Sequence, residues 1–98
     1  VGVRTVEITE KGLVLNGSLF PEKLIGGNRH QDFARLGNAV PNNLQWQDAV
    51  KLRKAGMRVI RSAHYPQDPA FMDACDRLGL FVIVATPGWQ FWGSVRCV

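Results

Sequence analysis

The 98-residue sequence predicts an α/β fold in which three parallel strands and two helices follow a β-hairpin. Two amphipathic segments each end at a glycine, and a short apolar run follows each of them at once. A segment rich in β-branched residues, with alternating polarity, opens the chain. Strand, helix, strand, helix, strand is the order of two successive βαβ units, whose right-handed crossovers make the strands parallel.

The first part of the chain is predicted to form the hairpin. Residues 3–10 read as a strand with valine and isoleucine on one face, and residues 13–17 read as a second strand that ends in an Asn-Gly turn signal. We therefore divide the chain into a lead-in hairpin, 1–17, and a second domain, 18–98.

The second domain is expected to begin with a short strand, 23–26, and a long polar loop over 28–41. A helix follows, with Asn43 as its N-cap and Gly56 as its C-terminal stop. The apolar side of this helix consists of Trp46, Ala49, Val50 and Leu52. The next expected strand, 57–60, is short and apolar.

The second helix has stronger signals. Asp68 and Pro69 suit its N-cap and first turn, and Gly79 ends it. Its buried stripe is predicted to contain Phe71, Ala74, Cys75 and Leu78. Residues 80–86 then form a continuous apolar run, which is typical of a strand covered on both faces.

Composition and charge argue against several classes of function. The formal net charge is +4, but only Lys51, Arg53 and Lys54 cluster, as on a solvated helix face, so we predict no nucleic-acid partner. No apolar run approaches the roughly 20 residues that span a bilayer, so we predict no membrane partner. Two cysteines are too few for a disulfide framework. No signal peptide is recognised, yet one could have been removed, so cytoplasm and periplasm both stay open as locations.

Polar and aromatic side chains gather where the three parallel strands are expected to end. In βαβ folds the ligand site lies at these carboxyl ends. The residues concerned are Asn28, His30, Arg61, His64, Tyr65 and Trp89. A single histidine there more often caps backbone carbonyls, but both histidines converge with an arginine and a tryptophan, which indicates a binding site.

Two other functions stay open at this edge. His30, Asp32 and His64 have the composition of a two-histidine, one-carboxylate iron site, although such oxygenases usually have all-β frameworks. The second alternative is a non-catalytic carbohydrate-binding or self-assembling module that holds its ligand without cleaving it. Our preferred prediction includes neither a metal nor a cofactor.

Three motifs resemble a known family: "VEITEKGLVLNG", "GGNRHQD" and "AGMRVIRSAHYPQDPAFMDACDRLGLFV". They are similar to the start of the catalytic barrel in glycoside hydrolase family 2, the β-galactosidase, β-glucuronidase and β-mannosidase group. The resemblance implies a partial (β/α)₈ barrel, retaining O-glycosidase chemistry and a carbohydrate ligand. It also implies that His30 and His64 line the sugar subsite, and that Arg61 supports the catalytic carboxylates.

The chain departs from this family pattern at three places. Between Gly17 and Asn28 the family commonly has a lysine-proline-aromatic strand that ends in "GVN", whereas this chain has the slightly longer "SLFPEKLIGG". Gln31 stands where the family commonly has glutamate, which removes a charge from the site. The third strand is followed by "PGWQFW", in which Trp89, Phe91 and Trp92 suit stacking on a pyranose face as well as they suit a core.

Retaining hydrolysis needs two carboxyl groups about 5 to 5.5 Å apart. Of the eight acidic residues only Asp32 is expected in a strand-end loop, and the family's catalytic pair follows its fourth and seventh barrel strands. We therefore expect no catalytic residue here and no hydrolysis by this chain alone, because 98 residues are a fragment of a barrel of about 250. Unpaired sheet edges predict a homodimer or larger homo-oligomer.

Overall fold

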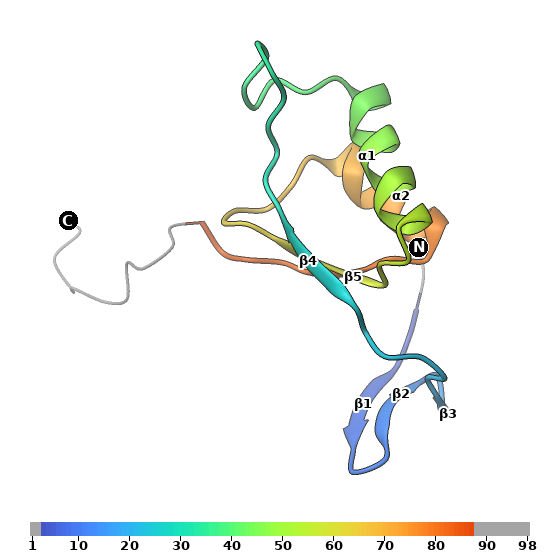
Figure 1. The fold of residues 1–98 in the computed structure, drawn as a ribbon. Helices are drawn as coiled ribbons and strands as arrows, with labels where there is room; N and C mark the ends of the chain where they lie inside the picture. The colour runs from blue at the N-terminus through green and yellow to red at the C-terminus, as the bar shows by residue number, and fades with distance from the viewer. Residues whose placement is uncertain (1–2, 88–98) are drawn as a thin grey trace, which may run out of the picture.

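The computed structural model describes residues 3–87, and its centre is a parallel sheet covered by two helices on one side (Figure 1). The strands lie in the order β4, β5, β6, and both connections between them are helical. The elements are β4 (Gly26–Arg29), α1 (Asn42–Lys54), β5 (Val59–Ser62), α2 (Pro69–Leu78) and β6 (Phe81–Ile83). The described chain therefore contains two βαβ units.

A small antiparallel sheet precedes this unit and lies beyond the amino ends of its strands (Figure 1). It consists of β1 (Val6–Thr9), β2 (Gly12–Leu15) and β3 (Ser18–Leu19). β1 pairs with β2, and β2 pairs in turn with β3, so the small sheet extends past position 17. The ring of Phe20 then meets Phe81 edge to face at 5.6 Å, which joins the small sheet to the start of β6.

The first parallel strand lies further along the chain than expected. It was predicted at 23–26, with a loop from 28, but β4 begins at Gly26 and pairs with β5 up to Arg29. A Cβ atom on Gly26 would lie 1.7 Å from the carbonyl oxygen of Val59, so only glycine permits this close approach of two strands. The glycine pair that suggested a chain break is thus part of the sheet.

The second parallel strand is also displaced, from the predicted 57–60 to β5. Its residues alternate: Ile60 and Ser62 are buried towards the helices, whereas Arg61 between them is exposed on the other face. Hydrogen-bond pairing with β4 and β6 extends the strand beyond its apolar residues, so the polar residues Arg61 and Ser62 also belong to it.

The first helix, α1, begins close to the expected place, but with a different N-cap residue. Its N-cap is Pro41, without a side-chain hydrogen bond, so the predicted Asn43 cap is wrong. The predicted apolar side is also partly wrong, because Trp46 is 38% exposed while Gln45 is fully buried. Ala49 is fully buried as predicted. Gln45 is buried because it accepts a hydrogen bond from the buried Arg29.

The second helix confirms its sequence signals. The Asp68 carboxylate accepts a hydrogen bond from the Ala70 N–H at 2.8 Å, Pro69 opens the helix, and Gly79 ends it in the left-handed conformation at φ +71°. The core of the described chain consists of Ala49, Ile60, Phe71, Ala74, Cys75 and Leu80. This core holds both helices against the sheet.

The third parallel strand was predicted to be covered on both faces, and this is wrong for the described residues. β6 is only three residues long, Ile83 is 58% exposed and the following Val84 is also exposed. The helices cover one face of the sheet, and no described element covers the other. The face opposite the helices therefore carries the exposed row of side chains that includes Arg61.

Candidate functional site

A row of exposed side chains crosses the parallel sheet near its carboxyl edge. Asn28 pairs in register with Arg61, and Arg61 pairs with Ile83. All three are exposed. Because side chains alternate along a strand, this row lies on the face away from the helices. An amide, a guanidinium and an apolar side chain thus stand side by side.

The two histidines lie just beyond this row, in the segments that leave β4 and β5. The ring centroids of His30 and His64 are 5.3 Å apart, and the ring planes meet edge to face at 78°. The Nη1 atom of Arg61 is 3.3 Å from Nδ1 of His64. The predicted residues Asn28, His30, Arg61 and His64 are thus brought to one edge, whereas Trp89 lies outside the described residues.

The contact between Arg61 and His64 fixes the chemistry of the ring. A guanidinium group only donates hydrogen bonds, so Nδ1 of His64 accepts and Nε2 carries the ring proton when this contact is made. With the amide of Asn28 and the second imidazole, the edge offers both donors and acceptors.

Sequence reasoning missed Arg29, which lies between two of the predicted residues. Its side chain faces the helices and is only 6% exposed. Nη1 donates to Gln67 at 2.6 Å, and Nη2 donates to Gln45 at 2.7 Å and to the Asp48 carboxylate at 2.8 Å. Its guanidinium carbon also lies 3.9 Å from the centre of the Phe71 ring.

This buried guanidinium fastens the end of β4 to both helical connections. Gln45 and Asp48 belong to α1, whereas Gln67 precedes α2. The signal that could have revealed it is the alternation of side chains along the strand: with Asn28 on the exposed face, the next residue must face the helices. Arg29 thereby holds the backbone between Asn28 and His30 in place.

The iron-site alternative finds no support in residues 3–87, where no group of three histidine, cysteine, aspartate or glutamate side chains is placed to hold a metal ion. Asp32 therefore does not join the two histidines as a third ligand. Over the same residues, no helix is long and apolar enough to cross a membrane.

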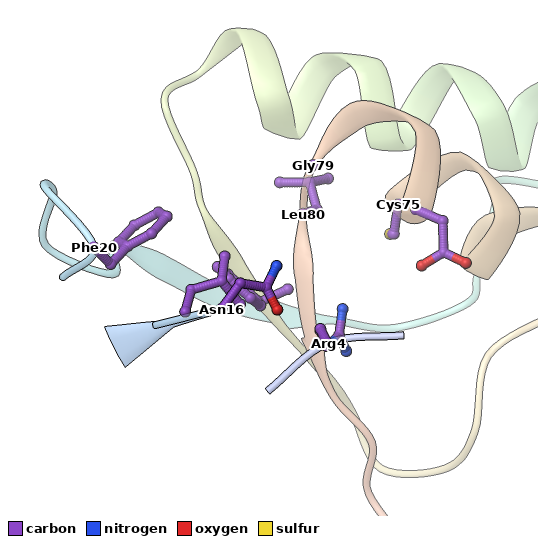
Figure 2. Close-up of a pocket in the computed structure, with 9 residues that line it drawn as sticks. Arg4, Asn16, Phe20, Cys75, Gly79 and Leu80 are labelled. Atoms are coloured by element: carbon purple, nitrogen blue, oxygen red, sulfur yellow. The ribbon is translucent and has the colours of Figure 1, made fainter. Parts of the chain in front are cut away.

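A hollow lies at the opposite, amino-terminal end of the parallel sheet (Figure 2). Its volume is about 300 Å³. It is lined by Arg4, Leu15, Asn16, Phe20, Cys75, Asp76, Gly79, Leu80 and Phe81. Burial raises the pKa of the Cys75 thiol to about 11, so this sulfur is an unreactive part of the wall at neutral pH.

The fold and the polar edge define a class of protein: a parallel βαβ domain with polar side chains at the carboxyl ends of its strands, which is where such folds generally bind ligands. The family description "Glycosyl hydrolases family 2, TIM barrel domain" matches residues 6–95. The chain belongs to this family, as part of its TIM barrel domain.

Curated relatives agree with this assignment. The chain is 45% identical to a β-galactosidase of Thermoanaerobacter pseudethanolicus, over 95% of the chain and 12% of that relative. It is 38% identical to a β-glucuronidase of Sus scrofa, over 90% of the chain and 13% of that relative. The chain thus spans about one eighth of the length of these enzymes.

Solved structures show the same fold. A β-glycosidase from Bacteroides vulgatus superposes with a TM-score of 0.77 and 33% identity, over 88% of the chain and 11% of that structure. A glycosyl hydrolase family 2 member from Bacteroides cellulosilyticus superposes with a TM-score of 0.78 and 34% identity, over 88% of the chain and 12% of that structure. The βαβ arrangement is therefore shared with known family 2 glycosidases.

Proposed function

We propose that this chain forms part of the sugar subsite of a β-galactosidase-like retaining glycosidase. The observation that carries the proposal is the convergence of His30, His64 and Arg61 at the carboxyl edge of a family 2 barrel segment. Imidazole, guanidinium and the neighbouring amide of Asn28 match the mixed donors and acceptors of a pyranose ring. The names of the relatives favour a β-galactoside or a β-glucuronide.

We further propose that residues 3–87 bind a sugar without cleaving it. Asp48 is engaged by Arg29, Glu22 by Arg58, and Asp68 caps α2. Among the described residues, Asp32 is then the one carboxylate at the carboxyl edge that neither forms such an ion pair nor caps a helix. Retaining hydrolysis needs two carboxyl groups. The catalytic pair must be supplied from outside these residues.

Calorimetric titration of the 98-residue chain with a non-hydrolysable β-thiogalactoside tests this function. We expect saturable binding that weakens about tenfold, roughly 1.4 kcal/mol, in Arg61→Met and His64→Phe. Arg77→Met is the matched control, because this arginine is exposed on α2, away from the site. A nitrophenyl β-galactoside should be hydrolysed no faster than in buffer. Equal affinity in all four proteins, or no binding at all, would remove the proposed subsite.

A self-assembling module is the second candidate, favoured by the edges of the parallel sheet. Within residues 3–87, β4 and β6 are outer strands with unpaired edges, and Ile25, Ile83 and Val84 near them are exposed. Such edges invite pairing with a second copy, which would make a homo-oligomer.

A further inference from the structure

We propose that Gln31 and Tyr65 act as a clasp that positions His30 and His64 against each other. Each clasp residue directly follows one histidine in the sequence, so the clasp joins the exit of β4 to the exit of β5. The consequence for sugar binding rests on the function proposed above, whereas the geometry of the clasp does not. Gln31 and Tyr65 are positioning residues, since they act through the histidines.

The first half of the clasp is made by the Tyr65 hydroxyl. The Gln31 backbone N–H donates to this oxygen at 3.0 Å, and the hydroxyl lies 3.5 Å from the Gln31 carbonyl, to which it donates. A single phenol oxygen therefore contacts both backbone groups of the residue after His30. This fixes the peptide that leaves β4 relative to the one that leaves β5.

The second half is made by the Gln31 side chain. Its Oε1 accepts from the Asp68 N–H at 2.7 Å, and its Nε2 donates to the Asn38 carbonyl at 3.0 Å. One side chain thus ties the N-cap of α2 to the loop before α1. Gln31 and Tyr65 are half-buried, and the bond to Asp68 is partly buried, whereas the bond to Asn38 lies in an exposed part of the loop.

The chemistry of the two partners favours an amide at position 31. Asp68 offers an N–H and Asn38 offers a carbonyl, so the side chain between them must accept at one atom and donate at the other. A carboxylate only accepts, and would face the Asn38 carbonyl with like partial charges. Gln31→Glu should therefore keep the Asp68 bond and lose the Asn38 bond.

The test is nuclear Overhauser contact between the His30 and His64 rings in the 98-residue chain, without ligand. The edge-to-face pair predicts a clear ring-to-ring signal in the unaltered protein. Gln31→Met and Tyr65→Phe should weaken this signal at least threefold, and Gln31→Glu should give an intermediate value. Gln47→Met is the matched control, because the same change falls on an exposed site of α1 and should leave the signal unchanged.

Two further readouts separate positioning from general stability and from sugar binding. Tyr65→Phe removes one oxygen only, so the chemical shifts of the core methyl groups of Ile60 and Ala74 should not change. If these methyl shifts change as much as the shifts of the His30 and His64 ring protons, the clasp is merely structural and the inference fails. An unchanged ring-to-ring signal in both clasp variants also overturns it. Thiogalactoside affinity should fall about tenfold in the clasp variants. If the unaltered chain binds no sugar while the ring signals respond as predicted, the proposed function fails and the clasp stands.

Discussion

Replacement of Arg29 by methionine should destabilise the chain more than any other single loss of charge among the described residues. Methionine has a similar length and suits a buried site, so the change removes the guanidinium without leaving a large cavity. What remains behind is a fully buried Gln45 amide, a nearly buried Gln67 amide and the Asp48 carboxylate, all without their cationic partner.

The magnitude follows from these contacts. Loss of one partner from a buried ion pair costs about 3 to 5 kcal/mol. The Asp48 side chain keeps 28% exposure, so water compensates part of the loss and the lower end applies. We expect about 3 kcal/mol, out of the roughly 5 to 15 kcal/mol that stabilises a domain of ordinary size. Arg29→Lys keeps the charge but cannot reach all three partners, and should cost about half as much.

Urea unfolding followed by circular dichroism at 222 nm measures these differences, provided that the slope of free energy against urea stays constant. Arg77→Met, on the exposed face of α2, should change the free energy of unfolding by less than about 1 kcal/mol. If Arg29→Met cost no more than this control, the buried network would not hold the strand end in place.

Three further outcomes follow from the structure. Gly26→Ala should destabilise the β4–β5 pairing strongly, whereas Gly27→Ala, whose added Cβ would meet nothing closer than 4.0 Å, should be tolerated; equal unfolding midpoints would contradict this. Because burial raises the pKa of Cys75 from 9.0 to about 11, its contribution to stability is present below about pH 9 and is lost as pH rises towards 11. In a Cys97→Ser background at pH 8, the thiolate fraction of Cys75 should be about 100-fold lower in the folded chain than in the unfolded chain, and its rate of reaction with a disulfide reagent should fall accordingly. Equal rates in the two states would refute the burial argument. The exposed sheet edges predict a dimer or larger assembly, and a monomeric mass by light scattering at micromolar concentration would count against it.

The sequence predicted the second helix well, because the residues that determine its ends and its buried face lie within the helix or next to it. The cap at Asp68, the first-turn Pro69 and the left-handed Gly79 act within one turn of the helix end. Its buried stripe follows from helical periodicity alone, and Phe71 is fully buried as predicted. Neither feature depends on a distant part of the chain.

The first parallel strand could not be predicted correctly, because its cause is tertiary. Two adjacent glycines read as a break in a single segment, whereas Gly26 is needed for the approach of Val59 from 33 residues further along. The same limit explains the error on α1. Gln45 is buried and Trp46 is partly exposed because Arg29, on the strand β4, must be hydrogen-bonded inside the protein.

The candidate site was predicted in part, for a related reason. The rule that ligands bind at the carboxyl ends of parallel strands placed Asn28, His30, Arg61 and His64 together without any coordinates. The supporting contacts of Arg29 and of the clasp could not be predicted, since hydrogen bonds between residues far apart in the sequence leave no periodic pattern in a single sequence. The role of the site residues in binding sugar stays a prediction.

The most direct test of that role is the intermolecular nuclear Overhauser contact between a bound β-thiogalactoside and the chain. The proposed subsite predicts signals from sugar ring protons to the ring protons of both His30 and His64. Signals to Phe20 and Phe81 instead would place the sugar in the hollow at the amino-terminal end of the sheet. That result would contradict the assignment of the strand-end histidines to the sugar subsite.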